Sequence, residues 1–181
     1  MIDKVPDEQL VGTLSNFRCT RDEDIQDFLQ NKALEYENRG WCSTYVLANE
    51  EKLDKDSKLW IDGYFTLSNK VIELTDFVSK TQRRKLFKGL KKNDNFMHFI
   101  LVGQLGKYID ERSSETVYGE TSAVEMLDKA FEIIYQVKER ITCSYVLIEC
   151  KDDMKVRMIY ENYGFKELQK ENELIQYVKF I

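Results

Sequence analysis

The sequence contains few of the residues from which enzymes most often build a reactive centre. It has one histidine, His98, and four widely spaced cysteines, Cys19, Cys42, Cys143 and Cys150. One histidine cannot supply a multi-histidine metal site, and His98 lies in an apolar run, where we expect a buried, hydrogen-bonded imidazole. No histidine or other base adjoins Cys150 in the sequence, which disfavours a covalent cysteine route. We therefore expect no metal site, and we expect side chains other than histidine and cysteine to perform any chemistry.

A polar loop, residues 112–121, runs directly into a long amphipathic helix and could hold an anion. Ser122 and Glu125 form an S-x-x-E capping box at the start of that helix. Backbone N–H groups converge at a helix N-terminus, and the helix dipole there favours negative charge such as a pyrophosphate. The same pattern also describes a capped surface helix without a ligand. Two carboxylates in the loop would repel a phosphate, those of Glu115 and Glu120.

Hydrophobic spacing divides the chain into alternating strands and helices. It predicts strands over residues 11–18, 43–48, 59–67, 96–105, 145–148, 165–168 and 174–181. It predicts helices after the turn at residues 20–24, from residue 123 onward and over 156–163, and a short basic helix or loop at 80–92. Gly164 stands where a glycine would cap the C-terminus of the helix over 156–163. This order describes one mixed α/β sheet flanked by helices. The 181 residues suit a single domain, residues 1–181.

Three strings, whose order and spacing along the chain also match, resemble the GNAT (Gcn5-related) N-acetyltransferase family. YVLIECKDDMKVRMIYENYGF is similar to the family's fifth strand and fourth helix, with the Tyr-x-x-x-Gly-Phe signature at Tyr160, Gly164 and Phe165. LVGQLGKY is similar to the fourth strand of the branch that includes the acetyltransferase toxins of toxin–antitoxin pairs. GETSAVEMLDKAFEII is similar to the start of the helix under the acetyl-CoA pyrophosphate. The resemblance implies a GNAT-like fold, with a mostly antiparallel sheet whose fourth and fifth strands are parallel and splayed apart.

The resemblance also implies acetyl-CoA as co-substrate and assigns residues to it. The pantetheine arm would pair with the backbone at the end of the fourth strand, at Leu105, Gly106 and Lys107. The pyrophosphate would lie at the polar loop, where the family's glycine pattern keeps only its central glycine. The candidates there are Arg112, Thr116, Tyr118, Gly119 and Thr121. Asp153 stands where the family often has an asparagine that touches the cofactor, and we take capping of the next helix as its main role.

Tyr160 occupies the position of the family's general acid. Acyl transfer from a thioester to an amine expels a thiolate whose conjugate acid has a pKa of about 8.5, by analogy with cysteine. A phenol within hydrogen-bond reach can protonate that leaving group. Outside this motif, Tyr160 would be interpreted as a core tyrosine. A carboxylate, a water or no dedicated base could deprotonate the amine, and the sequence does not choose among Glu73, Asp76, Asp110 and Glu111.

The implied function is transfer of an acetyl group from acetyl-CoA directly to a primary amine of a small molecule or protein. One alternative is a toxin that acetylates aminoacyl-tRNA, which a basic stretch without acids would suit: Lys80, Arg83, Arg84, Lys85, Lys88, Lys91 and Lys92. That stretch could also clamp an acidic antitoxin or a CoA phosphate, or be a solvated helix face. The net charge of −5 argues against broad nucleic-acid binding. A second alternative is a non-catalytic binding module, which the reduced glycine loop would suit.

Two features of the sequence predict the cellular compartment, namely the first ten residues and the spacing of the cysteines. MIDKVPDEQL has no apolar signal core, and no apolar run approaches the roughly 18–20 residues of a membrane span. The cysteines form no closely spaced pairs, and a domain of this size does not need disulfides. We expect a cytoplasmic protein with reduced thiols and no membrane partner. A homodimer formed through the last strands is consistent with the resemblance.

Overall fold

The computed structural model describes residues 7–53, 59–74, 79–87, 95–112 and 114–181. The chain forms two compact units. Unit 1 comprises residues 1–66 and 104–126, and unit 2 comprises residues 67–103 and 127–181. No helix in the described part of the chain is long and apolar enough to cross a membrane.

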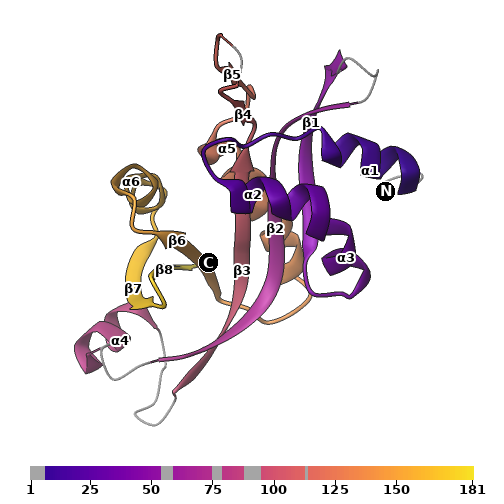
Figure 1. The fold of residues 1–181 in the computed structure, drawn as a ribbon. Helices are drawn as coiled ribbons and strands as arrows, with labels where there is room; N and C mark the ends of the chain where they lie inside the picture. Colours follow the sequence, from indigo (N-terminus) through magenta and orange to yellow (C-terminus); the bar gives the residue numbers. More distant parts are fainter. Residues whose placement is uncertain (1–6, 54–58, 75–78, 88–94, 113) are drawn as a thin grey trace. The chain divides into compact units, whose positions relative to one another are not determined.

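The longer strands form a mixed six-stranded sheet in the order β1-β2-β3-β6-β8-β7 (Figure 1). Their bounds are Ser43–Leu53 for β1, Leu59–Glu73 for β2, Phe96–Lys107 for β3, Tyr145–Lys151 for β6, Lys166–Glu171 for β7 and Leu174–Phe180 for β8. Strand β6 is parallel to β3 and antiparallel to β8, and β7 and β8 form an antiparallel hairpin. A separate two-stranded ladder joins β4 (Ile109–Asp110) to β5 (Val117–Tyr118). A mixed sheet with one parallel pair is the architecture that the sequence predicts.

In unit 1, four consecutive helical segments precede β1. They are α1 (Asp7–Ser15), α2 (Glu23–Asp27), the π-helical segment η1 (Phe28–Lys32) and α3 (Ala33–Asn38). The apolar side chains of η1 and α3 pack around Tyr64, which is fully buried. The predicted strand at residues 11–18 is wrong, because α1 covers most of that stretch. Leu14 and Phe17, three residues apart, are both buried while Val11 is exposed, and a spacing of three places side chains on one face of a helical turn but on opposite faces of a strand.

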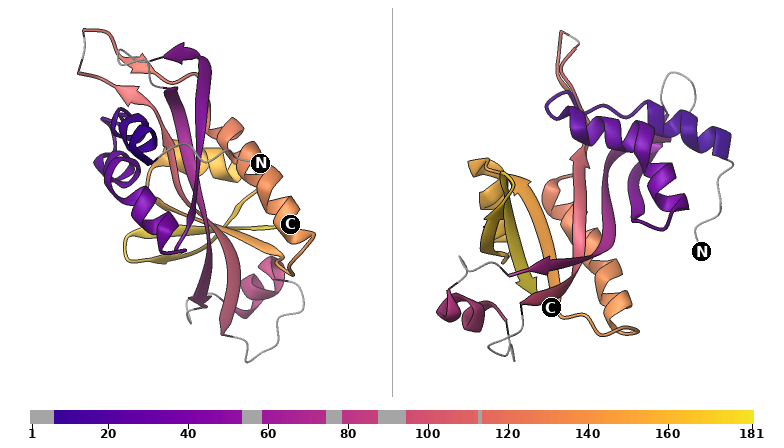
Figure 2. Two further views of the ribbon diagram at one scale, coloured as in Figure 1. Left: turned by 90° about the vertical axis from the view of Figure 1, so that its right-hand side faces the viewer. Right: turned by 60° about the horizontal axis from the view of Figure 1, so that its bottom comes forward.

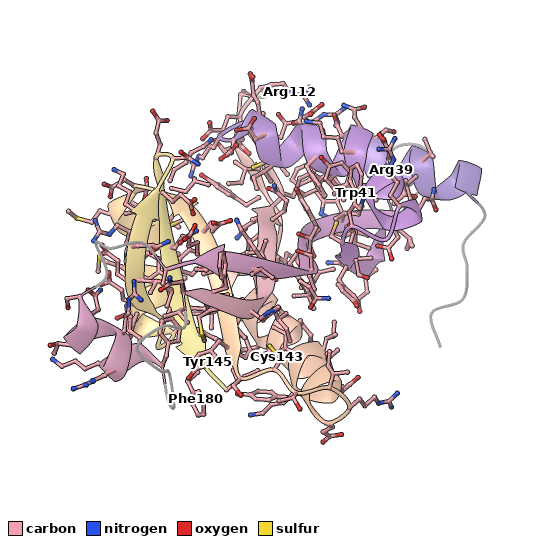
Figure 3. The ribbon with its side chains drawn as sticks, turned by 90° about the horizontal axis from the view of Figure 1, so that it is seen from below. Arg39, Trp41, Arg112, Cys143, Tyr145 and Phe180 are labelled. Atoms are coloured by element: carbon pink, nitrogen blue, oxygen red, sulfur yellow. The ribbon has the colours of Figure 1, made fainter. Side chains whose placement is uncertain are left out.

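Unit 2 contains α4 (Lys80–Leu86), most of α5 (Ala123–Lys138) and α6 (Met154–Asn162). Figure 2 shows the yellow β7–β8 hairpin beside β6. One face of this part of the sheet carries a hydrophobic cluster of Ile72, Leu74, Phe87, Phe99, Tyr145, Leu147, Leu168 and Val178. The Tyr145 ring lies 5.5 Å from that of Phe180 on the neighbouring strand (Figure 3).

Three details of the strands differ from the sequence prediction. Strand β2 continues six residues beyond the predicted end at residue 67, to Glu73. Strand β3 is not covered on both faces, since exposed and buried positions are interspersed along it. His98 is one of its exposed residues, so the predicted buried imidazole is wrong. The last turn is shorter than predicted and consists of Asn172 and Glu173, both with positive φ.

Candidate functional site

The parallel pairing of β3 with β6 ends before either strand does. It runs from Ile100↔Val146 to Val102↔Ile148, whereas β6 continues to Lys151 and stays paired with β8 on its other side as far as Leu174. Among the described residues, the edge of β6 that faced β3 therefore has no ladder partner over its last three residues. Backbone N–H and C=O groups on such an edge can pair with another extended chain. The resemblance implies that the two parallel strands lose their pairing in this way. The family binds the pantetheine arm where these strands separate, and the sequence analysis assigned its contacts to Leu105, Gly106 and Lys107.

Helix α6 follows this end of β6, and its two caps explain where it lies. The Asp153 carboxylate accepts hydrogen bonds from the backbone N–H groups of Lys155, at 2.8 Å, and Val156, at 3.0 Å. Asp153 is therefore the N-cap that the sequence predicts. Gly164 follows the helix with a φ of 94°, a left-handed conformation that glycine adopts at little cost, which confirms the predicted C-terminal cap.

Tyr160 is the buried residue of α6, with 6% of its surface exposed. Its ring centre lies 6.1 Å from those of Phe165 and of Tyr177. Burial raises the pKa of the Tyr160 phenol well above its usual value, so the group stays protonated at neutral pH. No hydrogen bond joins this hydroxyl to any other residue in the described part of the chain. The hydroxyl oxygen is not one of the fully enclosed unpartnered atoms of the described residues, so it stays accessible at the edge of a largely buried ring and can donate to a ligand.

Other buried or partly buried tyrosines have partners for their hydroxyls. Tyr163 donates to Asp128 at 2.7 Å, and Tyr64 donates to the backbone oxygen of Ile25 at 2.6 Å. The Tyr177 hydroxyl accepts from an arginine and donates to a glutamate. Tyr108 in unit 1 is also buried without such a bond among the described residues, so what distinguishes Tyr160 is an unpartnered hydroxyl on the helix that follows the free end of β6.

The neighbouring cysteine is a poor nucleophile. Burial raises the pKa of the Cys150 thiol to about 11, so the thiol stays protonated at neutral pH. All four cysteines are free thiols. This agrees with the prediction from sequence that the chemistry does not pass through an acetyl-cysteine.

In unit 1, the predicted capping box forms at the start of α5. The Ser122 hydroxyl accepts from the N–H of Glu125 at 3.2 Å, and the Glu125 carboxylate accepts from the N–H of Ser122 at 2.7 Å. The bond from the Ser122 N–H to the carboxylate is the main reason that the pKa of Glu125 is lowered. In the described part of the chain, the N–H groups of Thr121, Ala123 and Val124 meet no acceptor. They are the donors that this helix start can offer to an anion.

The loop before α5 is held by Asp62, a residue that the sequence analysis did not single out. Its carboxylate accepts from the N–H of Glu120 at 3.0 Å and from the indole N–H of Trp60 at 2.9 Å. Gly119 packs so closely against Asp62 that an added Cβ would lie 2.3 Å from the Asp62 carbonyl oxygen. The available signal was an acidic residue inside the apolar strand LWIDGYF, because a buried carboxylate needs partners.

Glu120 does not confront an anion with an unpaired charge. Its carboxylate is bound by the Lys52 ammonium and accepts from the Asn49 amide at 3.1 Å. The bond from Lys52 is the main reason that the pKa of Glu120 is lowered. This pairing weakens the repulsion that the sequence predicts for Glu120.

Arg112 and Asp110 form a pair that changes the predicted role of each. The guanidinium donates twice to the Asp110 carboxylate, at 2.8 and 2.5 Å, and the Arg112 N–H adds a third bond at 3.1 Å. These bonds hold the pKa of Asp110 at about 2, which makes it a weak base. The Arg112 charge is correspondingly engaged within the protein, although its side chain, labelled in Figure 3, remains 62% exposed.

Tyr118 lies in a cluster of charged residues on unit 1. The Arg21 guanidinium is 5.6 Å from its ring centre and donates to its hydroxyl at 3.1 Å. The Lys107 ammonium lies 5.9 Å from the same ring. Arg21 also pairs with Glu111 at 2.7 Å, so this candidate base is held in an ion pair.

Gly106 is required by packing inside unit 1. A Cβ there would lie 2.4 Å from Ile25 and 2.6 Å from Tyr64. Leu105 and Lys107 on either side are partly buried, and Thr116 is exposed. Unit 1 thus contains eight predicted cofactor residues: Leu105, Gly106, Lys107, Arg112, Thr116, Tyr118, Gly119 and Thr121. Unit 2 contains Tyr160 and Asp153.

The remaining candidates are only partly covered by the structure. Glu73 is exposed at the end of β2, and Asp76 lies outside the described residues. Within the basic stretch, α4 exposes Arg84 and Lys85. Arg83 instead donates to the backbone oxygen of Leu74 at 2.9 Å. Three lysines of the stretch fall outside the described residues, Lys88, Lys91 and Lys92.

Comparisons of the sequence and of the structure with known proteins identify the fold. Neither a scan against protein-family models nor a search of curated proteins finds a match. Solved structures do match: AtaT complexed with acetyl-methionyl-tRNAfMet has a TM-score of 0.64 and 19% identity, over 91% of this chain and 85% of that one. The chain has the GNAT fold of these toxins.

Further structures agree with that assignment. AtaTR bound with AcCoA has a TM-score of 0.65 and 19% identity, over 92% of this chain and 86% of that one. A tyrosine-to-phenylalanine mutant of KacT has the same TM-score and identity, over 91% and 86%. The fold predicted by the resemblance is therefore confirmed.

Proposed function

We propose that the protein transfers an acetyl group from acetyl-CoA directly to a primary amine, with Tyr160 as the general acid. The observation that carries the proposal is the Tyr160 phenol, which is buried, protonated and without a hydrogen-bond partner among the described residues. It stands on the helix that follows β6, the strand whose pairing with β3 ends early. AtaT and KacT, which share the fold, have both been solved as tyrosine-to-phenylalanine mutants.

The proposed reaction needs one proton donor at the sulfur. The amine nitrogen attacks the thioester carbonyl carbon, and the C–S bond breaks. The Tyr160 O–H gives its proton to the departing sulfur, and the proton lost by the nitrogen restores the phenol. The products are an N-acetyl amide and a free thiol, so atoms and charge balance.

Each unit, taken by itself, offers one kind of contact that suits a part of acetyl-CoA. The free edge of β6 after Ile148 can pair with the amide groups of the pantetheine arm. The N–H groups of Thr121, Ala123 and Val124, at the start of α5, can hold the pyrophosphate. AtaTR has been solved with AcCoA bound, which supports this co-substrate.

The test is product formation with a panel of acceptors. The protein is incubated with acetyl-CoA and with amino-acid amides, polyamines or lysine peptides, and acetylated products are identified by mass spectrometry. We expect one acetyl group on an amine for each thiol released. Thiol release without any acetylated amine would overturn the proposal, and so would the absence of both with every acceptor, which is the outcome expected of a non-catalytic binding module.

We further propose aminoacyl-tRNA as the acceptor, ahead of a small molecule or a protein. The support is that AtaT has been solved with acetyl-methionyl-tRNAfMet, and that α4 exposes Arg84 and Lys85 without a described acid in its sequence. An antitoxin partner fits the same proposal, because AtaT has been solved with the C-terminus of AtaR. The homodimer remains a prediction.

This acceptor is tested by tRNA binding at several salt concentrations. The Arg84→Gln/Lys85→Gln variant should weaken binding and reduce the slope of log K against log[salt] by about one to two units. A matched control is Lys129→Gln, which removes a lysine that is ion-paired on α5. Equal tRNA binding by the wild type, the double variant and the control variant would contradict the tRNA proposal, and so would the absence of binding at low salt. A small molecule or a protein would then be the remaining acceptor.

A further inference from the structure

Four polar side chains line up across one face of the sheet in unit 2. This polar row consists of Lys70 on β2, Glu149 on β6, Gln176 on β8 and Glu171 on β7. On three of the strands the row lies two residues from a member of the hydrophobic cluster, namely Ile72, Leu147 and Val178. Side chains two apart on a strand share a face, so the row continues that face beyond its apolar part.

The row is joined by short hydrogen bonds. The Lys70 ammonium lies 2.5 Å from one oxygen of Glu149, and the Gln176 amide nitrogen donates to the other oxygen at 2.7 Å. The same nitrogen donates to Glu171 at 2.9 Å. Glu149 is the partly buried member of its ion pair, with 16% of its side chain exposed against 35% for Lys70. The Glu149 carboxylate is thus mostly buried and held in place by hydrogen bonds. The Lys70 ammonium, which is more exposed, is the cation that covers it.

Gln176 carries an acceptor that the protein leaves unused. The residue is fully buried, and its side-chain oxygen has no hydrogen-bond partner among the described residues. The orientation of the amide is fixed, because exchanging its two ends would place the oxygen against two carboxylates. An unsatisfied buried acceptor costs free energy and calls for a donor that the protein itself does not supply.

The row also lies where the pairing between β3 and β6 ends. Glu149 is the first residue of β6 beyond its last pairing with β3, at Ile148. Gly103, which follows the last paired residue of β3, adds no side chain to this face and is exposed. Cys150, the next residue of β6, is among the groups that act electrostatically on the Tyr160 phenol. Adjacent residues of a strand point to opposite faces, so the row and the proposed general acid lie on opposite faces of the sheet, at the end of β6 where it is no longer paired with β3.

We propose that the polar row binds the ammonium group of the acceptor, with Glu149 as its counter-ion and Lys70 as the internal cation that the acceptor displaces. This inference rests on the proposed function, since it names the acceptor subsite of that reaction. An acceptor ammonium has three N–H donors, one for Glu149 and others for the unused Gln176 oxygen and for solvent. Neutral analogues of the amine would lack the charge that this exchange requires.

The experiment titrates the protein with n-propylammonium chloride and follows the Gln176 side-chain amide by ¹⁵N NMR. Potassium chloride at equal ionic strength and n-propanol are the controls for salt and for the apolar chain. We expect a saturable shift with the ammonium only. Glu149→Gln should weaken binding by about tenfold or more. Lys70→Met should strengthen it by about threefold or more, because the competing cation is gone.

The opposite signs of these two effects separate a subsite from a structural ion pair. A purely structural pair predicts that both variants lower stability and that neither responds to the ammonium. The matched controls are Glu132→Gln and Lys129→Met, which break an exposed ion pair on α5 and should leave the titration unchanged. If Lys70→Met does not fold, Lys70→Gln provides the same comparison.

Acetyl-CoA binding, measured on the same samples, keeps this inference distinct from the proposed function. An ammonium shift without acetyl-CoA binding would overturn the proposed function and retain a cation site. Acetyl-CoA binding with no shift at Gln176 in either wild type or Lys70→Met would overturn the subsite alone. A Gln176 shift that n-propanol reproduces would also overturn it, since charge would then not be recognised.

Discussion

The loop that enters α5 in unit 1 and the segment around α6 in unit 2 use hydrogen bonds in opposite ways. In the loop, protein acceptors already engage the N–H groups of Gly119, Glu120 and Ser122. At α6, the caps are satisfied but the one buried phenol has no partner among the described residues. The first region is shaped by its own contacts and leaves only backbone donors for an anion, at Thr121, Ala123 and Val124, whereas the second leaves a side-chain donor for a ligand. Satisfied groups maintain a shape, and an unsatisfied one indicates where chemistry takes place.

The largest effect is expected at α6, from Tyr160→Phe. Removing the hydroxyl takes away the proton donor but not the ring that packs against Phe165 and Tyr177. Turnover should fall by about 100-fold or more while acetyl-CoA still binds. Steady-state rates and calorimetry measure the two quantities. Tyr163→Phe is the control, because its hydroxyl is bound to Asp128, and an equal loss of turnover in both variants would break the distinction between free and engaged phenols.

The next effect is expected in the loop, from Asp62→Ala. This change leaves the N–H groups of Glu120 and Trp60 without their acceptor, which should lower the free energy of unfolding by about 2–3 kcal/mol. Chemical denaturation measures the loss. Asp62→Asn keeps an acceptor oxygen in place and should restore most of it. If Asn is as damaging as Ala, the negative charge of Asp62 matters more than its hydrogen bonds.

A smaller effect is expected from Asp153→Ala. The change removes the N-cap of α6 and should cost about 1 kcal/mol of stability. Asp153→Asn should be nearly neutral in a thermal melt, because asparagine caps equally well. If Asn restores stability but not acetyl-CoA binding, Asp153 contacts the cofactor as well as capping the helix.

The smallest effect is expected in the pH dependence of unit 1. The pKa of Asp110 is held at about 2, below its unfolded value of about 3.9. The stability that this carboxylate contributes is therefore present above about pH 4 and is lost as the pH falls toward 2, by about 1 kcal/mol or less because Arg112 is exposed. Denaturation curves at several acidic pH values should show this slope in wild type and not in Asp110→Asn. An unchanged slope in the variant would assign it to other carboxylates.

The sequence predicted features that depend on neighbours along the chain. The Ser122–Glu125 capping box, the Asp153 cap and the Gly164 terminus each involve residues within a few positions of one another, and all three formed. The Tyr-x-x-x-Gly-Phe signature placed α6 correctly for the same reason. Local hydrogen-bonding patterns carry enough information to be recognised without a structure.

Features that depend on distant partners were missed or misjudged. Asp62 and Glu120 are far apart in sequence, so the bond between them left no pattern. The role of Arg112 toward a phosphate stays a prediction, and the sequence did not indicate that its guanidinium binds Asp110, two residues away. The stretch at residues 11–18 was predicted as a strand, but its apolar residues Val11, Leu14 and Phe17 stand three apart, which is a helical spacing, and α1 covers most of it.

Calorimetric titration of the wild-type protein with acetyl-CoA tests the central claim most directly. The account predicts saturable binding with one site per chain, and a melting temperature that rises with ligand concentration. CoA without the acetyl group should bind to the same site. The absence of heat and of any melting shift at millimolar acetyl-CoA would contradict the account.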